Sequence, residues 1–127
     1  MKELTKAEDQ VMQYLWDLDK GFLKDIVEKF PEPRPAYTTI STVIRVLVKK
    51  GFIRYRTYGK TNEYYPAVSR EKYFRGHVKT LITEYFDGSV VDFASFFTGG
   101  KEVDITELEE IQRLVEKKIQ EIKEEGE

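Results

Sequence analysis

The sequence has no cysteine, and this absence alone removes several classes of protein. A disulfide framework, a cysteine-ligated zinc site and a cysteine nucleophile all depend on that residue. The single histidine, His77, has no carboxylate pair spaced with it as a metal or catalytic site would need. No glycine-rich phosphate loop occurs, and Ser89 and Ser95 lack a neighbour that would activate them. We therefore expect no enzyme, no metal and no cofactor.

Long hydrophobic runs are also lacking. No stretch approaches the roughly 18 apolar residues that a membrane span needs. The N-terminal segment is charged and has no apolar run of the kind found in signal peptides. These features predict a cytoplasmic protein with no membrane partner. A hydrophobic content of 40%, with eight Phe, eight Tyr and one Trp, excludes an intrinsically disordered chain.

Acidic residues are missing from residues 33–62, the whole interval between Glu32 and Glu63. The bases in that interval are Arg34, Arg45, Lys49, Lys50, Arg54, Arg56 and Lys60. Because the net charge of the chain is −2, the gap does not reflect the bulk composition. A local cationic surface on an otherwise acidic chain is what binding to a polyanion requires, and DNA is the first candidate.

Three helices are predicted in the first fifty residues. Thr5 and Glu8 fit a capping box, which begins a helix over residues 6–18. A second amphipathic stretch includes Phe22 and continues to residue 30, where closely spaced prolines end it. A third helix covers about residues 38–50, with apolar residues at helical spacing and Gly51 at its C-terminal end.

A β-hairpin is expected next, because residues 52–58 alternate between large and charged side chains. Residues 59–62 have turn chemistry, and residues 63–66 form the returning strand. Ser69 is the expected N-cap of a fourth helix that runs to about residue 86. A short helix over residues 90–97 and a long last helix, begun by an Asp104–Glu107 capping box, follow. We expect two domains, residues 1–68 and 69–127.

Three helices and a hairpin in this order describe a winged helix-turn-helix. The expected fold class is therefore mainly α (α+β), with an N-terminal winged helix-turn-helix and a C-terminal helical dimerisation region. The third helix is expected to enter the major groove of DNA, and the hairpin to contact phosphates or the minor groove. The candidate DNA-binding residues are Tyr37, Thr38, Thr39, Ser41, Thr42, Arg45, Arg54, Arg56 and Lys60.

Plainer interpretations remain open for several of these residues. Thr38 or Ser41 can cap the third helix, and Arg45 can be a solvated surface residue. Lys49 and Lys50 suit the negative end of a helix dipole. The alternative function is a protein-interaction module whose basic face binds an acidic partner, since a winged-helix fold does not decide between the two.

The last segment has a different composition, with ten acids and five bases over residues 101–127, and such a segment would repel nucleic acid. Apolar residues recur along its predicted helix at spacings of three and four, close to a coiled-coil pattern. We expect these residues and those of the short helix to pack against a second copy of the chain; packing within one chain is the alternative. The expected dimerisation residues are Val91, Phe93, Phe96, Phe97, Ile105, Leu108, Ile111, Val115, Ile119 and Ile122.

Several of these strings resemble the penicillinase repressor family, of the BlaI/MecI type. The resemblance rests on residues 4–8, on Val11-Met12 and Leu15-Trp16, on residues 37–43, on residues 49–53 and on Tyr64-Tyr65. It covers residues 4–66 well and continues more weakly through the C-terminal helices.

This resemblance implies a homodimeric repressor that binds a palindromic double-stranded DNA operator. It also implies a further partner, a sensor-triggered protease that cuts an Asn-Phe bond in the C-terminal domain and so relieves repression. The corresponding residues here are Phe96 and Phe97, and the Asn is absent. Relatives that respond to copper use a C-terminal cysteine cluster, which this chain lacks.

Overall fold

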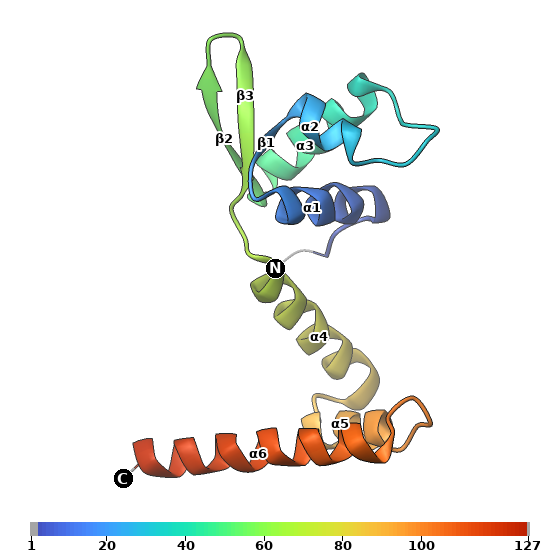
Figure 1. The fold of residues 1–127 in the computed structure, drawn as a ribbon, viewed down its shortest axis with the longest axis vertical. Helices are drawn as coiled ribbons and strands as arrows, with labels where there is room; N and C mark the ends of the chain where they lie inside the picture. The colour runs from blue at the N-terminus through green and yellow to red at the C-terminus, as the bar shows by residue number, and fades with distance from the viewer. Residues whose placement is uncertain (1–2, 127) are drawn as a thin grey trace. The chain divides into compact units, whose positions relative to one another are not determined.

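The computed structural model describes residues 3–126, which form helices and one small antiparallel sheet (Figure 1). The elements are, in chain order, α1 (Lys6–Leu18), β1 (Gly21–Phe22), α2 (Leu23–Glu28), α3 (Tyr37–Lys49), β2 (Ile53–Tyr58), β3 (Thr61–Pro66), α4 (Arg70–Phe86), α5 (Val90–Thr98) and α6 (Ile105–Glu125). Residues up to Pro66 thus form a winged helix-turn-helix, and the helices that follow complete the mainly α fold that the sequence predicts.

Local signals account for where most of these elements begin and end. The predicted capping box of α1 is present, with the Thr5 side chain accepting from the Glu8 N–H and the Glu8 carboxylate accepting from the Thr5 N–H. Gly51 follows α3 with φ +87°, a conformation that glycine adopts without a steric cost. Asp104 and Glu107 form the second predicted capping box, at the start of α6.

The sheet has the strand order β1-β3-β2, and every pairing in it is antiparallel. β2 and β3 form the predicted hairpin, which in Figure 1 extends beyond the three helices at its base. The strand β1 was not predicted. The sequence assigned Phe22 to the second amphipathic stretch, but Phe22 pairs with Glu63 of β3, and α2 begins only at Leu23. The sequence does not reveal this strand, because two residues are too few to show an alternating pattern and their partner strand lies about forty residues away.

The core of the winged helix lies among α1, α2, α3 and the base of the hairpin. Its buried side chains are Val11, Met12, Leu15, Ile26, Val27, Phe30, Ile40, Ile44, Leu47, Phe52 and Ile53. They come from every element of the domain except β1 and β3. Hydrophobic burial of this extent holds α3 in place despite its many β-branched residues, which lower intrinsic helix propensity.

The chain separates into two compact units, residues 1–78 and 79–127. The expected boundary after residue 68 falls before this division, because the first turns of α4 pack on the winged helix. The Tyr73 hydroxyl accepts from the Leu4 N–H at 3.0 Å. The Tyr73 ring also lies 5.8 Å from that of Phe52 and 6.0 Å from that of Trp16.

The second unit has its own aromatic cluster. The ring of Phe86 lies 5.7 Å from the rings of both Phe93 and Phe96, and Phe93 lies 6.1 Å from Phe97. Ser89 caps α5 by accepting from the Asp92 N–H. No described residue of α5 or α6 is buried.

Candidate nucleic-acid interface

The buried residues of α3 show which face of the helix points outward. Ile40, Ile44 and Leu47 are buried, which places the opposite side of the helix toward solvent. Four side chains lie along that opposite side at spacings of four, three and four residues, and all are exposed: Thr38, Thr42, Arg45 and Lys49. Of the other candidates on this helix, Thr39 and Tyr37 are exposed and Ser41 is half-buried.

The start of α3 has no side-chain cap. Its N-cap residue is Ala36, whose carbonyl accepts from the N–H groups of Thr39 and Ile40. The interpretation of Thr38 or Ser41 as a helix cap is therefore wrong. The uncapped end leaves the peptide N–H groups of Tyr37 and Thr38 without an acceptor among the described residues, and the helix dipole adds partial positive charge there. Such an end can accept a phosphate.

The hairpin separates its residues into two faces. Because side chains alternate along a strand, Arg54 and Arg56 share the face opposite that of the buried Ile53. Arg56 stands directly across from Glu63 on β3, and Arg54 across from Tyr65. Lys60 lies in the two-residue turn at the tip, beside Gly59 with φ +61°. Lys60 also lines a hollow together with Leu23, Lys24 and Asp25 at the start of α2.

Two of the seven bases in the acid-free interval are already paired within the domain. Lys50 donates to both carboxylate oxygens of Glu8 at 2.8 Å. Arg34 donates to the carbonyls of Phe30 and Glu28 and lies 3.3 Å from a carboxylate oxygen of Glu32. Neither Arg34 nor Lys50 was among the candidate DNA-binding residues, and both serve the fold of the domain. Among the described residues the other five form no ion pair: Arg45, Lys49, Arg54, Arg56 and Lys60.

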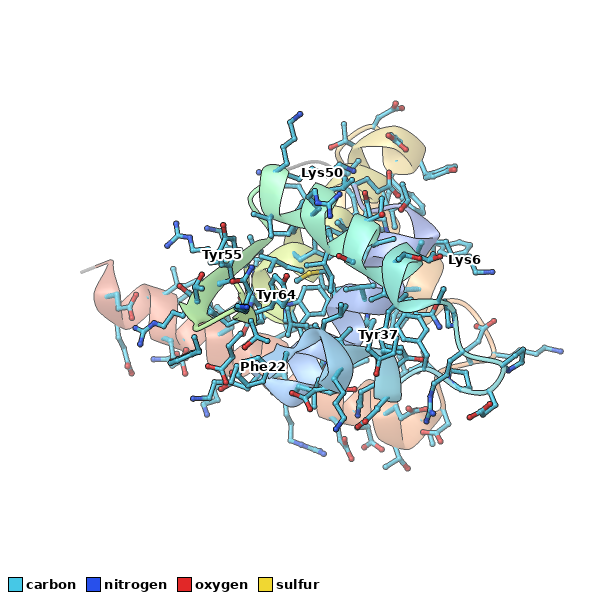
Figure 2. The ribbon with its side chains drawn as sticks, turned by 90° about the horizontal axis from the view of Figure 1, so that it is seen from above. Lys6, Phe22, Tyr37, Lys50, Tyr55 and Tyr64 are labelled. Carbon is cyan, nitrogen blue, oxygen red and sulfur yellow. The ribbon has the colours of Figure 1, made fainter. Side chains whose placement is uncertain are left out.

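Burial and pairing act against each other at Glu8. Its burial, at 6% exposure, would raise the pKa of the carboxyl. The hydrogen bond from Lys50, the bond from the Thr5 N–H, the charge of Lys50 and the Thr5 side chain outweigh that effect and lower the pKa of Glu8. Figure 2 shows Lys50 and Tyr37 at the two ends of α3, so Lys50 stands at the end away from the open N-terminus.

Sequence reasoning missed two residues of the outward face of α3. Lys49 was assigned to the helix C-terminus, although it continues the line of Thr38, Thr42 and Arg45. Val46 is 39% exposed next to that line. The signal was available in the sequence, because both positions lie opposite Ile40, Ile44 and Leu47 on a helix of 3.6 residues per turn.

Most of the expected dimerisation residues are exposed. Phe93, Leu108 and Ile111 are half-buried within the second unit. The others expose about half of their surface or more: Val91 77%, Phe96 71%, Phe97 49%, Ile105 70%, Val115 52%, Ile119 47% and Ile122 55%. Leu114, at 67%, Val90, at 65%, and Tyr85, at 75%, belong to the same exposed apolar set and were not in the expected one.

Residues 3–126 include no helix of the length and apolarity that a bilayer span requires. The same residues bring no three His, Asp or Glu side chains together in a way that would hold a metal ion.

A winged helix with an acid-free outer helix face defines a class, the winged-helix DNA-binding proteins. Residues 4–117 match the family model described as penicillinase repressor, and the chain belongs to this family. It is a DNA-binding transcriptional repressor and not an enzyme. Membership in this family decides against the alternative of a module for an acidic protein partner.

The curated relatives are named methicillin resistance regulatory protein MecI. The protein from Mammaliicoccus sciuri is 27% identical over 117 residues, which are 91% of this chain and 95% of that protein. The proteins from Staphylococcus aureus strain N315 and Staphylococcus epidermidis are 26% identical over the same shares. A solved structure titled CopR repressor is 27% identical, with a TM-score of 0.44, over 51% of this chain and 96% of that chain.

Proposed function

We propose that this repressor binds a two-fold symmetric operator as a homodimer, with α3 in the major groove of each half-site. The observation that carries this proposal is the outward face of α3, which bears Thr38, Thr42 and Arg45, has no acid and ends in an uncapped N-terminus. Short hydroxyl side chains let the helix approach the base edges closely. Arg45 is suited to a bidentate contact with guanine or phosphate.

The wing supplies contacts to the DNA backbone. Lys60 at its tip, with Arg54 and Arg56 on one strand, adds positive charge that no described acid neutralises through an ion pair. Arg54 and Arg56 share the face away from Ile53. From the hairpin they can reach phosphates beside the groove that α3 enters. Phosphate contacts of this kind set orientation and affinity and carry no base preference.

The second unit joins two copies of the chain. Leu108, Ile111, Val115, Ile119 and Ile122 form one stripe along α6, and none of them is buried within the chain. An exposed apolar stripe on a helix this long needs a partner surface. A second copy supplies the same stripe, and the exposed side chains of Phe96 and Phe97 extend the surface.

Dimerisation is also what DNA recognition requires. One winged helix makes few contacts, whereas two recognition helices matched to a two-fold operator double the interface. The bound dimer blocks the promoter sterically. Such a repressor acts in the compartment that holds the chromosome, and we place it in the cytoplasm.

Two measurements on the purified chain test the proposal. Footprinting on the DNA upstream of its own gene is expected to protect two half-sites about one helical turn apart, since recognition helices of a dimer follow that spacing. Light scattering after gel filtration is expected to give twice the mass of 15.0 kDa. A monomer, or retardation of every DNA fragment without preference, would overturn it.

A sensor-triggered protease is a further proposed partner, and it rests on the family resemblance. The Phe96-Phe97 bond lies in the last turn of α5, which ends at Thr98, so cleavage there requires that turn to unwind. The loop between α5 and α6 is a more accessible target, since proteases prefer exposed loops. Mass spectrometry of the chain recovered from repressed and derepressed cells tests this. An intact chain in derepressed cells would exclude a protease as the release step.

A further inference from the structure

The outward face of α3 carries two parallel rows of side chains. Residues four apart on a helix lie in one row. Thr38, Thr42 and Val46 form one row, and Ser41, Arg45 and Lys49 form the other. The second row carries the charge. The first row carries only β-branched side chains, whose common feature is an exposed methyl group.

The hydroxyl of Thr42 is already engaged within the helix. It donates to the carbonyl of Thr38 at 2.9 Å. Thr83 and Thr98 make the same bond on other helices, so the bond itself is ordinary. On α3, however, the bond affects what a ligand meets, because Thr42 lies on the outward face of the helix. With the hydroxyl proton used, Thr42 presents to a ligand its methyl group and an oxygen that can only accept.

Val46 extends the same apolar row by one turn. Its side chain is 39% exposed and adds nothing to the buried core. Valine is also a weaker helix former than most residues suited to an exposed helix position. Fold stability therefore does not account for a valine at this position, whereas an apolar contact on the ligand would.

We infer that Thr42 and Val46 read thymine bases through their C5-methyl groups. The inference rests on the proposed placement of α3 in the major groove. The thymine methyl is the one apolar group on the major-groove edge of the four standard bases. An apolar side chain placed on adenine, guanine or cytosine would instead cover a donor or acceptor and leave it unpaired.

The helix geometry limits where those thymines lie. Residues four apart are separated by about 6 Å along a helix axis, and bases on one strand by about 3.4 Å. Thr42 and Val46 therefore contact two thymines of the same half-site that are either adjacent or separated by one intervening base. Arg45, in the row alongside, contacts the base or phosphate next to them.

Replacement of thymine by uracil tests this inference directly, because uracil lacks only the methyl group. Each thymine of the footprinted operator is replaced in turn, and the dissociation constant is measured by fluorescence anisotropy at fixed salt. At two positions per half-site we expect affinity to fall about fourfold, the effect of one methyl group leaving a buried contact. At the remaining thymines we expect no change.

Matched variants assign each position to its side chain. Thr42→Ser keeps the hydroxyl and removes the methyl, and we expect it to abolish the uracil effect at one position only. Thr42→Val keeps a methyl and removes the hydroxyl, and the uracil effect should persist. Val46→Ala should abolish the effect at the other position. Circular dichroism confirms that each variant is folded.

The outcomes separate this inference from the proposed function. If the chain binds its operator with clear sequence preference, yet thymine and uracil are equivalent everywhere, the inference fails and the proposed function stands. An operator without thymine at such positions, or a uracil effect that survives both Thr42→Ser and Val46→Ala, overturns it equally. If no DNA is bound with preference, the proposed function itself fails.

Discussion

The ammonium group of Lys50 lies 2.8 Å from both carboxylate oxygens of Glu8, which joins the end of α3 to the first turn of α1. The two residues are 42 positions apart in the chain. Glu8 also closes the capping box of α1, so one carboxylate both begins α1 and holds the end of α3 against it. Lys50 is consequently part of the scaffold of the DNA-binding domain.

This pair makes stability depend on pH. The folded protein lowers the pKa of Glu8 below its ordinary value of 4.5. The stabilisation is therefore fully present above about pH 4.5, and it is lost as the pH falls through the lower folded value. We expect Glu8→Gln to cost about 1–3 kcal/mol at neutral pH, the range for a buried hydrogen-bonding group deprived of its partner.

Urea unfolding of both proteins at several pH values measures this. The difference between wild type and Glu8→Gln should shrink below pH 4.5. Glu71→Gln is the control, because Glu71 pairs with Arg75 on the surface, where both side chains are more than three-quarters exposed. A constant difference at all pH values would contradict the assignment.

Salt dependence distinguishes the wing from the recognition helix. Each phosphate contact contributes about 0.9 to the slope of log affinity against log salt. We expect Arg54→Gln with Arg56→Gln to weaken binding to all sequences similarly and to reduce the slope by up to about 1.8. Arg45→Gln should instead change base preference, at about 1–3 kcal/mol for a lost bidentate contact.

The control for charge is Arg75→Gln on α4, which removes a base outside the interface. Titrations of operator and non-specific DNA at four salt concentrations give the salt slope and the base preference of each variant. An unchanged slope in the double wing variant would place those arginines away from DNA.

The stripe on α6 predicts which substitutions separate the dimer. Ile119→Glu places a charge within the stripe of Leu108, Val115 and Ile122, and we expect a monomer that binds operator DNA far more weakly. Lys117→Glu lies on the opposite side of the same helix and should leave the dimer intact. Sedimentation velocity at micromolar concentration measures the state of each. A dimeric Ile119→Glu variant would favour packing of this stripe within one chain.

Substitution of alanine for glycine is expected to change stability in opposite directions at two positions. Gly51 ends α3 with φ +87°, so Gly51→Ala should destabilise by about 1–2 kcal/mol through backbone strain. Gly76 lies inside α4, and apart from its chain neighbours and the backbone of its own helix no described atom lies within 4 Å of an added Cβ, so Gly76→Ala should stabilise by up to about 1 kcal/mol. Thermal unfolding of both variants gives the two signs. Equal effects would mean that the turn after α3 tolerates any residue.

The sequence predicted the elements that carry their own local signals. These signals act within a few residues, so the positions of helices and strands follow from them. They are the capping boxes at Thr5 and Asp104, the glycine after α3 and the alternating pattern of β2. The acid-free interval likewise indicated the candidate interface. Membership in the family confirmed the repressor function, while the individual contact residues stay predictions.

Tertiary structure decided what depends on residues distant in the chain. It pairs Lys50 with Glu8, and Arg34 with the carbonyls of Glu28 and Phe30 at and just beyond the end of α2. It thereby divides bases that look alike in the sequence into those paired within the domain and those that form no ion pair. It also adds β1 through pairing with β3, and attaches the start of α4 to the first unit through Tyr73. These contacts join residues far apart in the chain, so no local sequence pattern encodes them. A lysine or a tyrosine looks the same in the sequence whether or not a distant residue packs against it in the fold.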